Sequence, residues 1–261
     1  IDPASCDGIG LMRSEFLFRD GAPLPDEEMQ YVAYRRLLEW AGTKPVTIRT
    51  LDVGGDKPIS GLTPVDELNP FLGLRGVRLT LANEDVFRTQ LRALARAAVH
   101  GNLKIMLPMI TIPRELARSK ELLEACLSEL RSRNIPCARP PVRIMVEVPA
   151  VALAPELFAA ADFLSIGSND LTQYVTAASR DDSRVASLND PSHPAVHRLI
   201  AQVAAFGLAS GTPVSLCGDM ASDPRHLPSL LQTGLRSLSI APSRISRIKA
   251  DKHPAFAIHW L

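Results

Sequence analysis

The sequence lacks an excess of charge of either sign. Of its 261 residues, 29 are Lys or Arg and 28 are Asp or Glu, which gives a formal net charge of +1. The two signs are interspersed, so the chain has no broad basic footprint of the kind that binds nucleic acid. We therefore expect no nucleic-acid partner, and any anion that the protein binds is expected to be small.

The sequence also lacks an apolar run approaching the roughly 18 residues that a membrane-spanning helix needs. Hydrophobic residues make up 46% of the chain, enough for a sizeable core. The N-terminal stretch "IDPASCDGIG" has no signal-peptide layout. These features predict a soluble globular protein without membrane insertion. Because the chain begins without Met, we expect it to be a fragment of a longer multidomain protein.

Cysteine is scarce, and its spacing excludes the usual metal and disulfide frameworks. The four cysteines are Cys6, Cys126, Cys137 and Cys217, with no CxxC pair among them. This usage is typical of reduced thiols, so we expect a cytoplasmic protein. Cys217 ends a predicted strand and precedes a glycine, which predicts an accessible, functional thiol. The other three are interpreted as small buried hydrophobic residues.

No low-complexity stretch or Pro/Gly-rich linker divides the chain, so residues 1–261 are predicted to form a single domain. Short apolar runs alternate with helical patterns, as in parallel sheets with helical crossovers. Helices are predicted over 26–41, 84–100 and 113–130. Strands are predicted over 8–13, 46–52, 72–79, 103–110, 142–148, 163–167, 214–218 and 237–241. Eight strands with interleaved helices predict an α/β fold, the (β/α)8 TIM barrel, with a doubly wound open sheet as the alternative.

The placement of the chemically capable residues favours the barrel. They lie at or just beyond the downstream ends of different predicted strands, which meet on one face in a barrel but spread along a line in an open sheet. These residues are Arg13, Arg49, Arg75, Glu147, Asn169 with Asp170, and Cys217.

Three arginines at three strand ends would bind a compact, multiply charged anion. The guanidinium group donates paired hydrogen bonds to carboxylates and to phosphates. Any one of the three could occupy its position by accident. That alternative is weaker for the set, because Arg13 and Arg49 each interrupt an apolar strand and would need a partner if buried.

Two carboxylates lie at the downstream ends of other predicted strands, Glu147 within the strand over 142–148 and Asp170 just beyond the strand over 163–167. A pair of this kind can hold Mg²⁺, which keeps several waters and takes further ligands from substrate oxygens. Such a pair can also serve as general acid and base in glycoside hydrolysis, although the arginines argue against a neutral sugar. Asp170 can in addition cap a helix that begins at "LTQY", and the two roles are compatible.

Six segments in order carry a family resemblance: "GIGLMRSEFLF", "RTLDVGGDKP", "NPFLGLRGVR", "MVEVPA", "SIGSNDLTQY" and "CGDMASDP". From residue 8 to about 249, the chain resembles the C-terminal phosphoenolpyruvate-binding domain of Enzyme I of the bacterial sugar phosphotransferase system. Pyruvate phosphate dikinase and phosphoenolpyruvate synthase share this barrel. The "RTLDVGGDK" motif is similar to the Enzyme I version and favours that branch.

The resemblance implies a (β/α)8 barrel that transfers the phosphoryl group of phosphoenolpyruvate, with Mg²⁺, to a histidine on a separate domain of the parent chain, releasing pyruvate. It implies a downstream histidine phosphocarrier protein and a homodimer. Glu147 and Asp170 would bind magnesium, and Cys217 would donate the proton to the enolate. The implied substrate-binding residues are Arg13, Arg49, Arg75, Asn169, Asp170 and Arg180.

The sequence departs from the family pattern at three places. Ser179 stands where the family usually has Asp, Asp219 stands where Glu is usual, and residues 247–261 do not resemble the family's closing helices. No segment of this chain resembles the phosphohistidine domain, so we expect the chain alone to bind phosphoenolpyruvate without turnover. The alternatives are a dikinase or synthase domain and a non-catalytic phosphoenolpyruvate sensor; the retained Cys217 favours catalysis.

Overall fold

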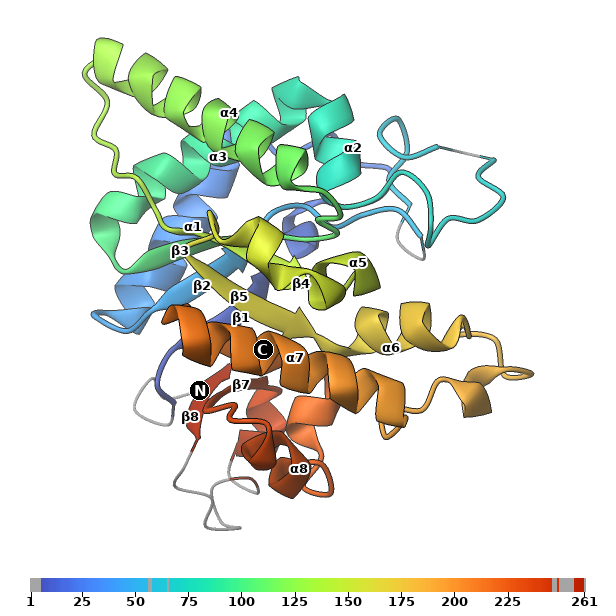
Figure 1. The fold of residues 1–261 in the computed structure, drawn as a ribbon. Helices are drawn as coiled ribbons and strands as arrows, with labels where there is room; N and C mark the ends of the chain where they lie inside the picture. Colours follow the sequence, from blue (N-terminus) through green and yellow to red (C-terminus); the bar gives the residue numbers. More distant parts are fainter. Residues whose placement is uncertain (1–5, 56–57, 65, 246–247, 249–255, 261) are drawn as a thin grey trace. The chain divides into compact units, whose positions relative to one another are not determined.

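The computed structural model describes residues 6–55, 58–64, 66–245, 248 and 256–260. Eight strands follow one another in chain order in a closed barrel, which confirms the (β/α)8 fold (Figure 1). The strands are β1 (Ile9–Arg13), β2 (Val46–Arg49), β3 (Leu103–Leu107), β4 (Val142–Val146), β5 (Phe163–Gly167), β6 (Val214–Cys217), β7 (Ser237–Ile240) and β8 (Ala257–Trp260). Among the described residues, no helix is both long and apolar enough to cross a membrane.

Contacts along the chain define two compact units, one of residues 12–142 and one of residues 1–11 with 143–261. In the first unit, β2 and β3 are parallel, with Val46 opposite Leu103 and Arg49 opposite Met106. All four residues of β2 are buried, as expected of a parallel strand covered on both faces. The unit's helices are α1 (Glu27–Ala41), α2 (Val77–Ala82), α3 (Glu84–Ala97) and α4 (Pro113–Ser132). Helix α3 lies alongside α4 (Figure 1).

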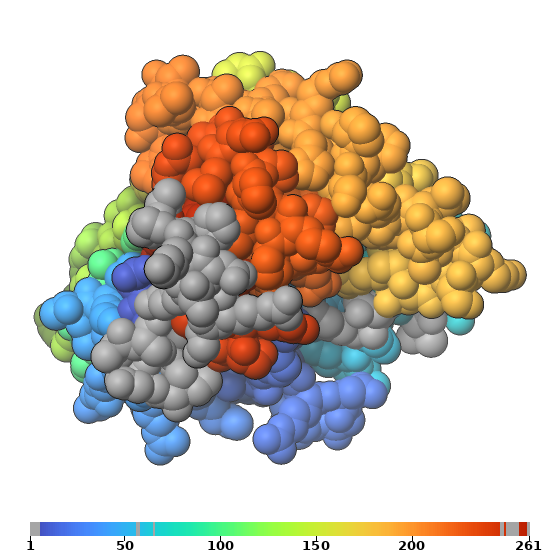
Figure 2. Space-filling view, turned by 90° about the horizontal axis from the view of Figure 1, so that it is seen from below, coloured from blue at the N-terminus to red at the C-terminus, as the bar shows by residue number. Residues whose placement is uncertain are grey.

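In the second unit, β4 to β8 pair in parallel, and β8 also pairs with β1 through Ile9 and Trp260. Its helices are α5 (Pro149–Leu153), α6 (Ser168–Thr176), α7 (Pro194–Ser210) and α8 (Leu227–Gln232). The orange surface of α7 adjoins the orange-red surface of α8 (Figure 2), where the rings of His197 and His226 lie 6.0 Å apart. That residues 1–261 form a single domain stays a prediction.

One predicted strand is wrong. Residues 72–79 form a turn and the start of α2, because Gly76 takes φ +58° and the chain turns there into the helix at Val77. The eighth strand is Ala257–Trp260, which lies in the segment that does not resemble the family. The predicted number of eight strands is therefore right, but one of the eight is predicted at the wrong place in the sequence.

The predicted helices are confirmed with small shifts at their ends. Helix α4 begins at Pro113 as predicted and continues to Ser132. Helix α3 ends at Ala97 and passes into a short 3₁₀ turn over residues 98–100. Asn83, a residue type typical of helix N-caps, occupies the N-cap position of α3, but its side chain makes no capping hydrogen bond and donates to the Leu79 carbonyl instead.

Candidate functional site

Two buried arginines and two buried carboxylates form an ion-pair array in the unit of residues 12–142. Arg49, at the end of β2, donates to Glu15 at 2.5 Å and to Asp52 at 2.7 Å. Arg75 donates to both oxygens of Asp52 at 3.2 Å. These four side chains are at most 8% exposed. Their charges balance within the set, which satisfies the requirement that buried charges be paired and fixes both guanidinium groups. We call these residues the arginine array.

Two glycines allow the backbone to approach the arginine array closely. Gly54 takes φ +102°, and a Cβ there would lie 2.8 Å from the Cβ of Arg75. Gly76 takes φ +58°, and a Cβ there would lie 2.9 Å from the Cβ of Met109. Both positions therefore require glycine for conformation and for space. The "DVGGDKP" segment over 52–58, in which a Gly-rich turn is expected from the sequence, contains Gly54, and its residues 56 and 57 lie outside the described residues.

A buried amide supports the arginine array from α3. The Gln90 side chain accepts from the backbone N–H of Leu51 at 2.9 Å and donates to the hydroxyls of Ser14 at 3.0 Å and Tyr34 at 3.1 Å. Ser14 precedes Glu15, and Leu51 precedes Asp52. Burial raises the pKa of Tyr34, so this hydroxyl stays protonated and can serve the network. Gln90 thus ties together the two segments that carry the carboxylates.

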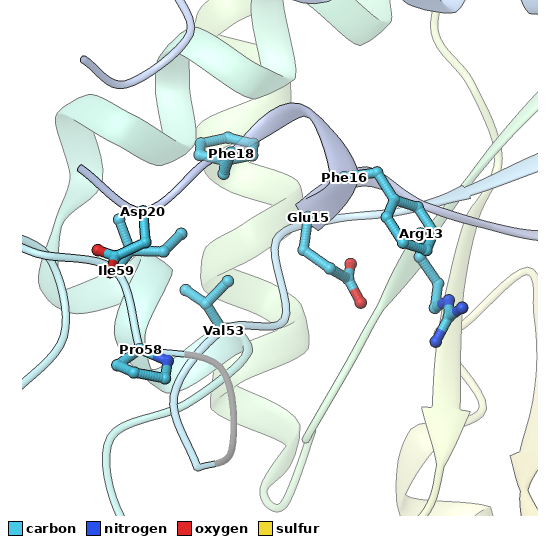
Figure 3. Close-up of a pocket in the computed structure, with 8 residues that line it drawn as sticks. All are labelled: Arg13, Glu15, Phe16, Phe18, Asp20, Val53, Pro58 and Ile59. Carbon is cyan, nitrogen blue, oxygen red and sulfur yellow. The ribbon is translucent and has the colours of Figure 1, made fainter. Parts of the chain in front are cut away.

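Arg13 lies beside this array with its side chain exposed. Its guanidinium carbon is 4.8 Å from the centre of the Phe16 ring. A cavity of about 200 Å³ opens here, and Figure 3 shows the Glu15 carboxylate turned toward the side on which Arg13 lies. The cavity is lined by Arg13, Glu15, Phe16, Phe18, Asp20, Val53, Pro58 and Ile59. Arg13 is therefore a solvent-accessible cation next to a fixed, charge-balanced set.

The second unit brings Glu147 to the start of α6. Glu147 follows β4 directly and is 1% exposed. A Cβ on Gly167, the last residue of β5, would lie 2.9 Å from Oε2 of Glu147, so only glycine leaves room for this carboxylate. Asp170 lies in the first turn of α6 and is 8% exposed. The helix begins at Ser168 with Gly167 as its N-cap, so the expectation that Asp170 caps it is wrong.

The donor set at Glu147 and Asp170 suits a hard cation that keeps water ligands. Among the described residues, no group of three or more His, Cys, Asp or Glu side chains is arranged to hold a metal ion. Two carboxylates are nevertheless the number expected for Mg²⁺ when waters and substrate oxygens complete the octahedron. The Glu147 carboxylate lies against the backbone of Gly167, in the space that a Cβ there would need. Gly167 immediately precedes α6, the helix that carries Asp170. The residues present therefore fit magnesium.

Asn169 is held by the loop that follows β6. Its amide donates to Asp219 Oδ2 at 2.9 Å, and its Oδ1 accepts from the Asp219 N–H at 2.9 Å. Gly218 takes φ +103°, and a Cβ there would lie 2.2 Å from the Ser168 hydroxyl. That hydroxyl donates to the Cys217 carbonyl at 2.8 Å. Asp219, one of the departures from the family pattern, is thus the residue that orients Asn169.

Cys217 is buried, so the expectation of an accessible thiol is wrong. It is 3% exposed, and its Sγ–H donates to the Ile166 carbonyl at 3.4 Å. Strand pairing with β5 and β7 covers it despite the glycine that follows. All four cysteines are free thiols. Cys6 and Cys126 are buried as expected, whereas Cys137 is only partly buried.

Arg180 lies in the loop after α6 and is partly exposed. Its backbone N–H donates to the Gln173 side chain at 3.3 Å, and its Nε lies 3.9 Å from Asp181 Oδ2. Ser179, the other departure, accepts from the Asp181 N–H at 3.2 Å. The loop therefore fixes the backbone of Arg180, while its side chain makes a long contact with a neighbouring carboxylate.

The structure gathers the predicted residues within each unit. Arg49 and Arg75 share Asp52, and Arg13 lies beside them; in the other unit, Glu147, Asp170, Asn169 and Cys217 follow neighbouring strands. Sequence reasoning missed Glu15, Asp52, Gln90 and Asp219. Asp52 carried a usable signal, because it is an acid at the end of an apolar strand, at position i+3 from Arg49. Gln90 carried none.

The family model for the phosphoenolpyruvate-binding domain of the PEP-utilising enzymes matches residues 2–254. A phosphoenolpyruvate-protein phosphotransferase from Geobacillus stearothermophilus is 46% identical over 247 residues, which cover 94% of this chain and 43% of that protein. The enzyme of the same name from Enterococcus faecalis is 42% identical over 248 residues, covering 94% of this chain and 43% of that protein. The chain thus spans less than half the length of these relatives.

Solved structures of low sequence identity share the barrel. A malate synthase from Haloferax volcanii superposes with a TM-score of 0.57 at 12% identity, covering 90% of this chain and 58% of that one. A citrate lyase from Burkholderia xenovorans superposes with a TM-score of 0.54 at 22% identity, covering 95% and 68%. At such identities the likeness shows the fold alone.

Proposed function

Because the chain belongs to the PEP-utilising enzymes and spans their phosphoenolpyruvate-binding domain, we propose that it is the substrate domain of a phosphoenolpyruvate-protein phosphotransferase. The observation that carries the proposal is the arginine array, with an exposed Arg13 beside it. Fixed guanidinium groups suit a substrate with a phosphate and a carboxylate. The names of the relatives favour this activity over the dikinase and synthase alternatives.

The arginines bind and orient the anionic groups of the substrate. Phosphoryl transfer passes through a loose transition state that spreads charge over the peripheral oxygens, so cations and donors held in place contribute most of the catalysis. Arg49 and Arg75 are held by Asp52 before substrate arrives, so little reorganisation accompanies binding. The more exposed Arg13 and Arg180 are assigned to binding of substrate oxygens, and Asn169 to hydrogen bonding of the phosphate.

Glu147 and Asp170 would hold Mg²⁺ as two carboxylate ligands. When bound there, magnesium acts as a Lewis acid that neutralises phosphate charge and stabilises the developing enolate. The carboxylate of Glu147 is set by its packing against Gly167, and Asp170 by its place in the first turn of α6. Asp170 is also assigned to substrate binding, because substrate oxygens would complete the coordination of the metal.

Cys217 is the acid that converts the enolate to pyruvate. A thiol is a weak acid that can serve as a general acid and deliver its proton to a carbon atom. The hydrogen bond to the Ile166 carbonyl holds that proton at one position until it is needed. Burial excludes solvent that would compete for the enolate.

The phosphoryl group passes to a histidine on a separate domain of the parent protein, and from there to a histidine phosphocarrier protein. We propose a cytoplasmic homodimer as the working form. The relatives, more than twice as long as the match, have room for such an additional domain.

Calorimetric titration of the chain with phosphoenolpyruvate, with and without Mg²⁺, tests substrate binding. We expect binding that weakens at least about tenfold on removal of magnesium or on the substitution Asp170→Asn, as for the loss of a metal ligand. Glu121→Gln, which alters an exposed ion pair on α4, is the matched control and should bind as the parent does. Binding indifferent to both the metal and Asp170→Asn would refute the proposed site.

The role of Cys217 separates catalysis from sensing. Cys217→Ala should retain phosphoenolpyruvate binding but slow pyruvate formation by about 10²–10⁴-fold when a phosphoryl-accepting domain is supplied, because the general acid is lost. Pyruvate release is followed with a coupled assay. Undiminished release would remove Cys217 from the mechanism, and the absence of any release by the parent chain would favour a sensor.

A further inference from the structure

Arg143, in the middle of the sheet on β4, is a buried cation with an unusual set of neighbours. The residue is 9% exposed, and its guanidinium carbon lies 3.6 Å from the centre of the Phe163 ring. Its Nη1 donates to the Ser215 hydroxyl at 3.3 Å. Within the described part of the chain, its Nε has no hydrogen-bond partner and no carboxylate lies within ion-pair distance. The charge is therefore held by neutral groups alone.

The same face of the sheet carries the thiol of Cys217. Arg143 is opposite Phe163 in the register of β4 and β5, and Ser165 follows Phe163 on that face. The Ser215 hydroxyl, which accepts from Arg143, donates to Ser165 at 3.0 Å. Cys217 is two residues after Ser215 on β6, and side chains two apart on a strand point to the same side. The guanidinium, two hydroxyls and the thiol thus share one surface.

Arg143 and Cys217 interact electrostatically on this surface. Burial lowers the pKa of Arg143 to about 9, and the charge of an ionised Cys217 acts in the opposite direction and raises it. The interaction is mutual, so the guanidinium favours the thiolate form of Cys217. The elements around the thiol also carry the carboxylates of Glu147, Asp170 and Asp219. On β7, the residue opposite Cys217 is an uncharged serine.

We propose that Arg143 is a positioning residue for Cys217, with a buried guanidinium that stabilises the thiolate left when Cys217 donates its proton. This inference rests on the proposed function. In the step, the Sγ–H bond breaks and its electron pair stays on sulfur. A C–H bond forms at the methylene carbon of the enolate from the C=C π pair, while the enolate oxygen becomes the carbonyl oxygen of pyruvate.

The absence of a carboxylate partner in the described residues is what makes Arg143 suited to this role. Arg49, by contrast, is paired with the carboxylates of Glu15 and Asp52. Serine hydroxyls and an aromatic ring orient a guanidinium without cancelling its charge. A cation of this kind, in a poorly hydrated interior, acts on a nearby anion more strongly than it would in water.

The titration of the Cys217 thiol tests the proposal without substrate or metal. The ultraviolet absorbance of the thiolate is followed against pH, and the same titration of Cys217→Ala is subtracted to remove the other three cysteines. In Arg143→Met, the midpoint should rise by about one pH unit or more, the usual effect of losing an opposite charge. Arg143→Lys, which keeps the charge, should titrate close to the parent.

Arg96→Met is the matched control. It removes a partly buried arginine of the unit of residues 12–142, where Arg96 on α3 pairs with Glu27 and Glu28 on α1. It should leave the Cys217 midpoint unchanged. Equal midpoints for Arg143→Met and the parent would overturn the proposal, as would a shift in Arg143→Lys as large as that in Arg143→Met. An unshifted thiol with intact phosphoenolpyruvate binding refutes the role of Arg143 alone. A shifted thiol in a chain that does not bind phosphoenolpyruvate supports the electrostatic pair and refutes the proposed function.

Discussion

Arg143→Met is expected to make the protein more stable. Burial lowers the pKa of Arg143 to about 9, and a shift of that size from the ordinary value of 12.5 corresponds to roughly 5 kcal/mol against the charged form. Because the pKa falls on folding, the charged side chain opposes folding throughout the range below about pH 9, which includes neutral pH. Contacts with Phe163 and Ser215 recover part of this cost. Replacement of a buried charge by an apolar side chain of similar length should therefore add about 1–3 kcal/mol to the free energy of unfolding.

Urea unfolding at pH 7 measures this difference, with circular dichroism and fluorescence as two probes of the same transition. Arg96→Met provides the contrast, since it breaks ion pairs to Glu27 and Glu28 and should destabilise the protein. If Arg143→Met instead lowered the free energy of unfolding by more than about 1 kcal/mol, the guanidinium would be a net stabilising group. The reasoning that its charge is retained for function would then fail.

Three further substitutions test the arginine array by the same urea assay. Asp52→Asn removes the carboxylate that bridges two buried guanidinium groups and should cost about 3–5 kcal/mol, whereas Glu39→Gln, in an exposed ion pair, should leave stability nearly unchanged. Gly54→Ala places a Cβ 2.8 Å from that of Arg75 at a φ of +102°, and should cost about 1–3 kcal/mol. Gln90→Leu leaves buried polar groups without their partner, and the free energy of unfolding should fall by about 1–3 kcal/mol for each group left unpaired. Unchanged urea midpoints would show that the array is not held as described.

The barrel was readable from the sequence because parallel strands buried on both faces leave continuous apolar runs. Strands β4 and β5 are buried at every position, and each was predicted within two residues of its ends. Helix α3 was equally clear, with Phe87, Leu91 and Leu94 on one buried face. The strand predicted over residues 72–79 is wrong because the spacing of its apolar residues fits either a strand or a helix. The turn at Gly76 decides for the helix.

Helix α1 shows a second limit of hydrophobic pattern. The sequence predicts a face of Met29, Val32, Ala33, Leu37 and Trp40, but the buried residues are Gln30, Tyr34, Leu38 and Ala41. Gln30 and Tyr34 are buried because they satisfy each other by a hydrogen bond of 3.1 Å, and Gln30 also donates to the Pro25 carbonyl at 2.9 Å. A pattern that scores polar side chains as exposed cannot find such a face.

The sequence predicts the charged residues of the candidate site but not the residues that pair with them. Arg49 and Glu147 were visible as lone charges in apolar strands, since a buried charge implies a partner or a ligand. The identity of the partner depends on contacts between segments distant in sequence, such as Glu15 with Arg49 and Asn169 with Asp219. The burial of Cys217 also follows from strand pairing, which the glycine after it does not reveal.

The most direct test of the central claim is whether phosphoenolpyruvate and a divalent cation bind together at Glu147 and Asp170. Mn²⁺ serves as a paramagnetic probe, and the relaxation of water protons reports its binding to the chain. The account predicts an enhancement that grows when phosphoenolpyruvate is added to the parent chain with Mn²⁺, and that is absent with Glu147→Gln. An enhancement that ignores phosphoenolpyruvate, or that survives Glu147→Gln unchanged, would contradict it.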